Sequence, residues 1–292
     1  MLNIVKNRFI YYSISAVIIL IGVVMAFVNG GFNLDVEFAG GTEIYVELGE
    51  KFDANAMQKA VDAVTAKNAK VQTVDGTNAS IKLAEISDAE ITAIRDVLVK
   101  DFGADEKAIS ENTISETVGS ELKKNALVGA LIAVVLMLIY IWIRFELLSG
   151  LAAVCALIHD VLIMISAYAI LQIPVDTSMI AAILTILGYS INATIVLFDR
   201  VRETTRLKPK MAFETVVKDS VKDTMGRSIN TTVTTLIVLA VLWILGVDSI
   251  RTFTLPIIVG VVAGFYSSVF LSGNFWIMFK KLRKDKNVVA QD

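Results

Sequence analysis

Six apolar runs, each long enough to cross a lipid bilayer, constrain this chain more than any other feature. The hydrocarbon core of a bilayer, about 30 Å thick, is crossed by roughly 20 helical residues. Lipid offers no hydrogen-bond partner to the backbone, so each run is expected to form a helix. Mean hydropathy is +0.66, and the charged residues lie mostly between the runs. The runs are residues 9–28, 126–143, 147–171, 179–198, 229–247 and 253–279.

The first run resembles a secretion signal because the basic residues Lys6 and Arg8 precede or open it. However, it is longer than the apolar core of an ordinary signal peptide, and no Ala-x-Ala exit follows it. We therefore expect this run to be an uncleaved membrane anchor.

The distribution of lysine and arginine predicts how the six helices are oriented. Basic residues are enriched in the loops that stay in the cytoplasm. If the N-terminus is cytoplasmic, the two short outer loops, near Pro174 and near Asp248, hold only Arg251. Both termini are therefore expected in the cytoplasm. The basic residues that would then lie on the cytoplasmic side are Lys6, Arg8, Arg144, Arg200, Arg202, Arg206, Lys208, Lys210, Lys218, Lys222, Arg227, Lys280, Lys281, Arg283, Lys284 and Lys286.

The hydrophilic stretch between the first two runs is expected to fold as a small α+β domain. Helical spacing of apolar residues predicts helices at 53–67 and 87–102, the second opening with the capping-box pattern Ser87-x-x-Glu90. Asp75-Gly76-Thr77-Asn78 predicts a hairpin turn. Alternation of apolar and polar residues predicts strands at 35–48, 70–74, 79–84 and 108–114. The resulting order, β-α-β-β-α-β, is typical of the ferredoxin-like fold.

The predicted fold class is thus a membrane all-α bundle of six transmembrane helices with a small extracytoplasmic α+β (ferredoxin-like) domain between helices 1 and 2. The cytoplasmic N-terminus and first helix form the first segment, and the extracytoplasmic domain the second. The third segment holds transmembrane helices 2–6, and the fourth is a basic cytoplasmic tail. Their expected boundaries are 1–28, 29–125, 126–279 and 280–292.

Several classes of function are disfavoured by what the sequence lacks. Cys155 is the only cysteine, which excludes an intrachain disulfide and a thiolate metal cluster, and a net charge of −2 does not suggest a nucleic-acid partner. There is no Gly-x-x-x-x-Gly-Lys-Ser/Thr loop for ATP, and one histidine cannot form His-Glu-x-x-His. Asp160 and Asp199 lack the Gly-x-Gly-Asp context of an intramembrane aspartyl protease. We therefore expect no enzyme, no metal and no cofactor.

Two segments carry a resemblance to a known family. The first is GFNLDVEFAGGT at 31–42, and the second is GYSINATIVLFDRVRE at 188–203. Together they resemble the SecF-type proteins of the SecD/SecF family, which is related to the resistance-nodulation-division transporters. Further matches are His159-Asp160, Arg227 and the Gly260-x-x-x-Gly264-x-x-Ser267-Ser268 pattern. The motif residues whose roles we expect to be structural or anchoring are Gly40, Gly41, Gly188, Asp199 and Arg200.

Two positions depart from the family pattern. The family's Asn-Asp-Thr reads Asn192-Ala193-Thr194 here, and its Phe-Gly-Gly reads Leu245-Gly246-Val247. The missing aspartate is the residue that the family's proton-relay model places in this half. The resemblance therefore implies that SecD supplies the main relay carboxylate, with Asp160 and Arg227 as the candidates of this chain.

Asp160 lies about midway along the third run. A carboxylate at that depth costs several kcal/mol unless it is protonated, paired or hydrated. Two interpretations remain open: a proton-binding site in a wet seam, or a hydrogen-bonded carboxyl group that locks helices together. His159 projects roughly 100° away from it around a helix. The two side chains therefore need not touch, and we expect His159 to be a polar contact between helices.

The other candidates lie in the last three runs. Asn192 and Thr194 are neutral and are expected to bridge helices by hydrogen bonds. Arg227 opens the fifth run, where it is expected either to reach into the bundle and meet a carboxylate or to stay at the boundary. Gly260 and Gly264 form a small face that lets another helix, of this chain or of a partner, approach closely.

The resemblance implies a subunit of the Sec protein translocase that works with SecD in late, proton-motive-force-driven steps of export across the bacterial cytoplasmic membrane. The implied partners are SecD, the SecYEG channel, accessory proteins of the YidC and YajC type, the translocating polypeptide and the lipid membrane, but no nucleic acid. Two alternatives remain. One is half of a proton-driven small-molecule or lipid transporter of the same superfamily, and the other is a structural scaffold for SecD.

Overall fold

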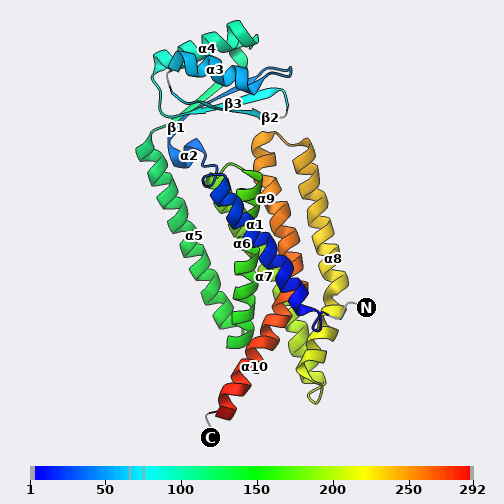
Figure 1. The fold of residues 1–292 in the computed structure, drawn as a ribbon. Helices are drawn as coiled ribbons and strands as arrows, with labels where there is room; N and C mark the ends of the chain where they lie inside the picture. The colour runs from blue at the N-terminus through cyan, green and yellow to red at the C-terminus, as the bar shows by residue number, and fades with distance from the viewer. Residues whose placement is uncertain (1–3, 66, 75, 290–292) are drawn as a thin grey trace. The chain divides into compact units, whose positions relative to one another are not determined.

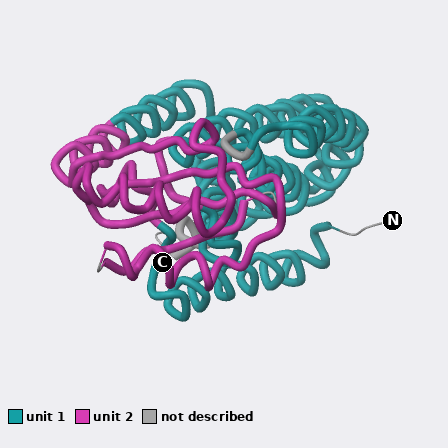
Figure 2. The backbone as a smooth tube through the Cα atoms, turned by 90° about the horizontal axis from the view of Figure 1, so that it is seen from above, with its two compact units in different colours: residues 1–33, 129–173, 178–292 teal, residues 34–128, 174–177 magenta. Residues whose placement is uncertain are grey.

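The computed structural model describes residues 4–65, 67–74 and 76–289 of the chain (Figure 1). The chain forms two compact units, shown in teal and magenta in Figure 2. The first, which we call the helical unit, comprises residues 1–33, 129–173 and 178–292. The second, the sheet unit, comprises residues 34–128 and 174–177.

Six helices within the described residues are long and apolar enough to cross a membrane, which confirms the six predicted spans. The last span is composite: α9 (Asp248–Tyr266) continues through a π-helical segment, η2 (Ser267–Ser272), into α10 (Gly273–Val289). The other five are single α-helices. They are α1 (Arg8–Val28), α5 (Glu116–Arg144), α6 (Leu147–Leu171), α7 (Thr177–Leu207) and α8 (Phe213–Leu245).

Three of these helices are longer than the apolar runs predicted. Helix α5 begins at Glu116 rather than at 126, α8 begins at Phe213 rather than at 229, and α7 continues to Leu207. Hydropathy marks only the part of a helix that suits lipid, whereas polar residues continue the same helix into water without a break. The apolar runs therefore predicted the number of spans correctly but made these three helices too short.

The centre of the helical unit is formed by α6 and the composite last helix. The most apolar stretch of each is 56% and 61% buried, against 6% for α5 and for α8. Small residues allow the close packing: a Cβ added to Gly22 of α1 would lie 2.7 Å from the Cα of Ser166 in α6. The exposed apolar side chains of α5 and α8 suit contact with lipid or with another membrane protein. They include Leu131, Trp142, Ile237 and Leu245.

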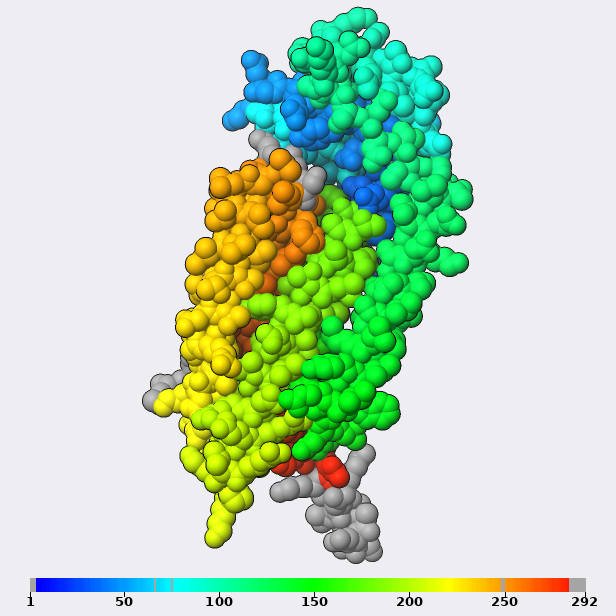
Figure 3. Space-filling model, turned by 180° about the vertical axis from the view of Figure 1, so that it is seen from behind, coloured from blue at the N-terminus to red at the C-terminus, as the bar shows by residue number. Residues whose placement is uncertain are grey.

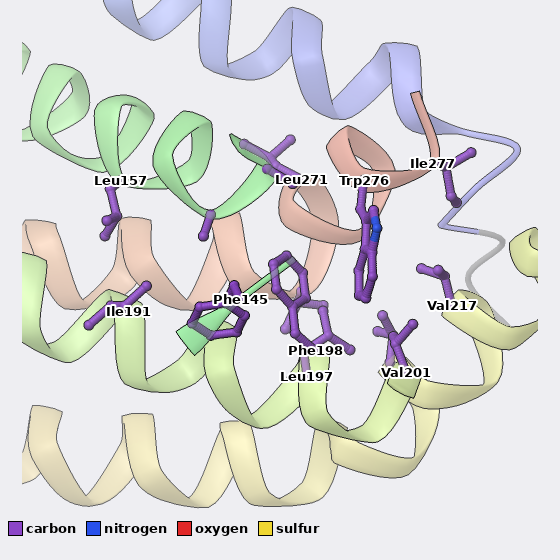
Figure 4. Packing of buried hydrophobic residues seen from close by; sticks show 14 of the residues in the cluster. Phe145, Leu157, Ile191, Leu197, Phe198, Val201, Val217, Leu271, Trp276 and Ile277 are labelled. Carbon is purple, nitrogen blue, oxygen red and sulfur yellow. The ribbon is translucent and has the colours of Figure 1, made fainter. Parts of the chain in front are cut away.

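Aromatic side chains hold together α7 and α10 (Figure 4). Phe198 is fully buried, with its ring centroid 4.8 Å from that of Trp276 and 6.1 Å from that of Phe145. Leu197 and Val201 of the same helix belong to the same cluster. Burying one such side chain stabilises a fold by about 1.5–3 kcal/mol, so this cluster fixes the packing of the two helices.

The sheet unit contains the four strands and two helices that the sequence predicts, in the predicted order. Its sheet has the strand order β2-β3-β1-β4, with every neighbouring pair antiparallel. The strands are β1 (Gly41–Glu47), β2 (Lys70–Val74), β3 (Asn78–Leu83) and β4 (Ile109–Ile114). The helices are α3 (Ala54–Thr65) and α4 (Asp88–Phe102), with a 3₁₀ turn, η1 (Glu106–Ala108), before β4.

Both helices contribute to the core of the sheet unit. The capping box at the start of α4 is formed: Ser87 accepts from the Glu90 backbone and the Glu90 carboxylate accepts from the Ser87 backbone. The fully buried core side chains of the strands and the two helices are Ile44, Val46, Ile81, Met57, Val61, Ile94 and Leu98. The predicted turn residue Asp75 lies outside the described residues.

The first predicted strand begins later than expected. Residues Val36–Ala39 form a short helix, α2, capped by the Asp35 carboxylate, and the strand starts at Gly41. Gly40 and Gly41 have positive φ angles of 73° and 131°. A Cβ on Gly41 would lie 2.2 Å from the carbonyl oxygen of Leu83, so only glycine fits there without a shift. The two glycines thus turn the chain from α2 into β1.

Candidate functional site

Asp160 lies in α6 with no exposed surface, and three side chains bind its carboxylate. Ser190 of α7 and Ser267 of η2 both donate to Oδ2, the second at 2.8 Å. The Nδ1 atom of His159 lies 2.8 Å from Oδ1. A buried carboxylate in a membrane helix is expected to be compensated in this way. The group therefore joins α6 to α7 and to the last helix.

His159 and Asp160 contact each other, although their adjacency in the sequence did not require it. The backbone directions of neighbouring helical residues diverge by roughly 100°, but both side chains are long enough to curve back toward each other. The Nε2 atom of His159 also lies 2.8 Å from the hydroxyl of Ser15 in α1. If Nδ1–H donates to an ionised Asp160, a neutral His159 accepts from Ser15 through Nε2. We call Ser15, His159, Asp160, Ser190 and Ser267 the buried polar network.

Two glycines of α9 allow the network to form. A Cβ on Gly264 would lie 3.2 Å from the Cβ of Ser190, and one on Gly260 would lie 2.4 Å from Cγ1 of Ile186. The small face predicted from the sequence therefore packs against α7 of this chain. Because α9 and α7 approach so closely, Ser190 and Ser267 reach the same oxygen of Asp160.

Thr194 and Asn192 of α7 differ in environment. Thr194 is fully buried, one turn from Ser190, and its hydroxyl has no hydrogen-bond partner among the described residues. Asn192 is exposed on another face of the same helix. The bridging of helices that we expected from both residues is therefore not formed within the described part of the chain.

Ala193 and Arg227 line a hollow between α7 and α8, which we call the α7–α8 hollow. Figure 3 shows this recess between α8, yellow to orange, and α7, yellow-green. Its volume of about 70 Å³ is enough to admit water, since roughly 10–15 Å³ suffices for one molecule. Its lining residues are Tyr189, Asn192, Ala193, Val196, Arg227, Ser228, Thr231, Thr232, Phe265 and Ser268.

Arg227 forms no ion pair with any residue that the structure describes, and its side chain is exposed. The carboxylate of Asp160 is bound to other groups and is absent from the lining of the α7–α8 hollow. Arg227 also lines a second hollow that contains three carboxylates, but none of the described ones is paired with it, so the predicted meeting with a carboxylate is not formed within the described residues. The position of the family aspartate, Ala193, lies in the same hollow as Arg227.

Asp199 and Arg200 connect α7 to its neighbours at one end of the bundle. Asp199 forms an ion pair at 3.5 Å with Arg144 of α5. Arg200 donates two hydrogen bonds to the Asp223 carboxylate of α8, at 3.0 and 2.5 Å, and one to Glu203 at 2.8 Å. These partly exposed pairs fix side-chain geometry more than they add stability. Gly188 is exposed, and a side chain there would meet open space.

The sequence did not identify the serines as partners of Asp160. Ser190 and Ser267 lie in the quoted motifs, but serines are common in membrane helices and only the packing register shows which ones meet. The available signal was a serine within one turn of a glycine in the same helix, as Ser267 lies three residues after Gly264.

Comparison with known proteins identifies the family. Residues 94–282 match the family described as "Protein export membrane protein SecD/SecF, C-terminal". Protein translocase subunit SecF of Sebaldella termitidis is 37% identical over 289 residues, which cover 97% of this chain and 93% of the relative. SecF of Acidaminococcus fermentans is 35% identical, covering 97% and 98%. The chain belongs to the SecD/SecF family of protein-export membrane proteins.

Within the family, this chain matches SecF subunits along almost their whole length and SecDF proteins along about two fifths. The crystal structure of SecDF from Thermus thermophilus, described as a translocon-associated membrane protein, superposes with a TM-score of 0.88 at 28% identity. It covers 96% of this chain and 39% of that one. SecDF in a super-membrane-facing form gives a TM-score of 0.72 at 26% identity, with 40% of that chain covered.

Proposed function

We propose that this protein is the SecF-type subunit of a Sec protein translocase and promotes protein export across the cytoplasmic membrane together with SecD. The observation that carries the proposal is the match to SecF subunits over 93% and 98% of their length. In SecDF proteins the matching region is 38–40% of one longer polypeptide. A SecD-type partner is therefore the natural complement of this chain.

The proton-motive force drives the work of this subunit, and Asp160 is its proton-binding group. The support is geometric, since both carboxylate oxygens hold partners from three structural elements. An ionised carboxylate only accepts hydrogen bonds, whereas a protonated one must also donate. Protonation therefore changes how α6 is held to α7 and to η2. A group whose two states favour different packing couples proton binding to conformation.

SecD supplies the main relay carboxylate, because Ala193 cannot bind a proton. Arg227 faces that carboxylate from the α7–α8 hollow, where its charge has no partner among the described residues. An arginine nearby favours the ionised form of a carboxylate, while burial opposes it. A structural scaffold for SecD is the second candidate function, and the alanine at position 193 is the observation that favours it.

Both termini lie in the cytoplasm, and residues 29–125 form an extracytoplasmic domain with the ferredoxin-like arrangement. The bias of basic residues supports the orientation, and the antiparallel strand order β2-β3-β1-β4 supports the arrangement. The SecYEG channel, accessory proteins of the YidC and YajC type and the translocating polypeptide are the further partners.

Co-purification tests the assignment. The full chain carrying an affinity tag is extracted in mild detergent, and the eluate is analysed by mass spectrometry. We expect a SecD-type protein in about equal amount, with SecY-type proteins at lower yield. A second tagged membrane protein of similar size and abundance is the control. Recovery of a functional, partner-free monomer contradicts the proposal.

Single-cysteine labelling tests the orientation. In a Cys155→Ala background, Thr73→Cys in the sheet unit is expected to react with an impermeant maleimide on intact cells. Lys210→Cys, between α7 and α8, is expected to react only after the membrane is opened. Labelling of position 210 in sealed cells reverses the assignment.

A further inference from the structure

A basic pocket lies where α1 and α8 begin and α10 passes. It has a volume of about 410 Å³ and lies within the helical unit. Its charged lining residues are Lys6, Arg8, Lys218, Lys281 and Glu214. We call it the basic pocket, and its position at the start of α1, whose apolar run begins at Phe9, indicates a place near the membrane boundary.

The charges of the basic pocket do not balance. Glu214 is the one carboxylate of its lining, and that carboxylate forms an ion pair with Lys281. Lys6, Arg8 and Lys218 form no ion pair with any described residue, although Arg8 lies over the ring of Phe9 at 5.2 Å. The described lining thus holds four cations and one carboxylate, which leaves the pocket a net charge of +3.

Two other charged hollows at an end of the bundle provide a comparison. One, a second hollow between α7 and α8 that is distinct from the α7–α8 hollow described above, contains three carboxylates, from Asp199, Glu203 and Asp223. The one beside Arg206 contains two of these. Their arginines are largely matched by acids, so cation excess is not a general property of charged hollows in this chain.

Helix polarity adds to the positive potential. The first turns of α1 and α8 both line the basic pocket, and neither helix has a side-chain cap at Asn7 or Ala212. Uncapped first turns leave backbone N–H groups without partners, and the helix dipole is positive at this end. The same groups that favour negative charge bind phosphate at many helix starts.

Apolar surface continues from the pocket along α1. Phe9 lines the pocket and is 69% exposed, and Ile10, Ile14 and Val17 of the same helix are also exposed. A free inorganic anion would make no favourable contact with this apolar surface. An acyl chain does, because it would run beside the apolar residues while its headgroup stayed at the helix start.

We propose that the basic pocket binds the phosphate of an anionic phospholipid, with the acyl chains lying along α1. Zwitterionic lipids bring an ammonium group that offsets their phosphate, so three unpaired cations select a headgroup of net negative charge. Basic pockets between membrane helices are suited to such headgroups. The proposal depends on the membrane location of the chain and not on its role in export.

Native mass spectrometry of the purified full-length protein tests the proposal, with phosphatidylglycerol and phosphatidylcholine of the same acyl chains as probes. We expect the wild-type protein to prefer phosphatidylglycerol. Each removed cation should lower that preference roughly fivefold, so Arg8→Gln combined with Lys218→Gln should lower it roughly 25-fold. Arg206→Gln removes a cation from a different hollow and is expected to leave the preference unchanged.

Three outcomes overturn the proposal: equal binding of the two lipids by the wild-type protein, an equal loss in Arg206→Gln, or displacement of phosphatidylglycerol by millimolar inorganic phosphate. The last outcome assigns the pocket to a soluble anion. The charge-conserving variant Arg8→Lys guards against misfolding, because it should retain the preference if charge is what matters. Size-exclusion profiles identify any variant that no longer folds.

Discussion

Replacing Asp160 by alanine should separate helices that the buried polar network holds together. The substitution removes two hydrogen bonds between helices, from Ser190 and Ser267. Such bonds contribute about 0.6 kcal/mol each on average in membrane proteins and about 1.7 at most, so the expected loss is about 1–3 kcal/mol. His159 also loses the group that orients it toward Ser15.

Asp160→Asn is the matched variant, because it keeps the shape and removes the titration. Its amide oxygen can accept from both serines while its NH₂ group faces His159, so we expect a loss below about 1 kcal/mol. Unfolding in mixed micelles with increasing SDS fraction, followed by tryptophan fluorescence, measures both variants. Equal stability of Asp160→Ala and wild type would refute the structural argument.

Export separates the two interpretations of Asp160. Secretion of a reporter polypeptide under an imposed proton gradient should fall in Asp160→Asn if the carboxyl group binds protons, because an amide cannot. Expression, partner recovery and stability of the variant serve as controls. Wild-type export by a well-folded Asp160→Asn protein would reduce Asp160 to a contact between helices.

Three further substitutions test other parts of the fold. Gly260→Ala places a Cβ 2.4 Å from Cγ1 of Ile186 and should cost about 1–3 kcal/mol, with partial rescue by Ile186→Ala; stability in SDS titration measures both. Ala193→Asp should assemble normally, because the α7–α8 hollow admits water and presents Arg227; failure to recover SecD with the variant would show that this seam is dry. In the sheet unit, hydrogen bonds from the N-cap serine lower the pKa of Glu90 below its ordinary value of 4.5. Its contribution to stability is therefore complete above about pH 4.5 and disappears as pH falls through the lowered pKa. The stability difference between wild type and Glu90→Gln should narrow over that range in thermal unfolding, and a difference that does not depend on pH would contradict the assignment.

Hydropathy and local capping rules predicted most of the fold because both depend on short segments. Six apolar runs gave six spans, and the Ser87–Glu90 pattern gave the start of α4. A helix keeps the same backbone where it passes from lipid into water. Hydropathy therefore did not indicate that α8 begins as early as Phe213. The short helix α2 also escaped prediction, because the alternation of residues 35–40 resembles a strand.

The site was predicted less completely than the fold, because it depends on how helices face one another. Asp160 stands out in any hydropathy pattern, and the resemblance drew attention to Arg227. Which serines reach Asp160 depends on the rotation of α7 and of the last helix, and no local pattern encodes that rotation. The partner of Arg227 is not determined by this chain's sequence, since the described residues hold no carboxylate within ion-pair distance of it.

The π-helical segment η2 changes the direction in which side chains of the last span point before and after it. A π-turn holds one residue more than an α-turn, and one residue corresponds to roughly 100° of rotation. Ser267, at its start, faces Asp160, while Trp276, beyond its end, packs on Phe198. Deleting one residue from η2 would keep one contact only by turning the other away. The π-turn thus adds one extra residue to the span. If that extra residue moved along the helix, the side chains that it passed would rotate about the helix axis, while both ends of the span stayed in place.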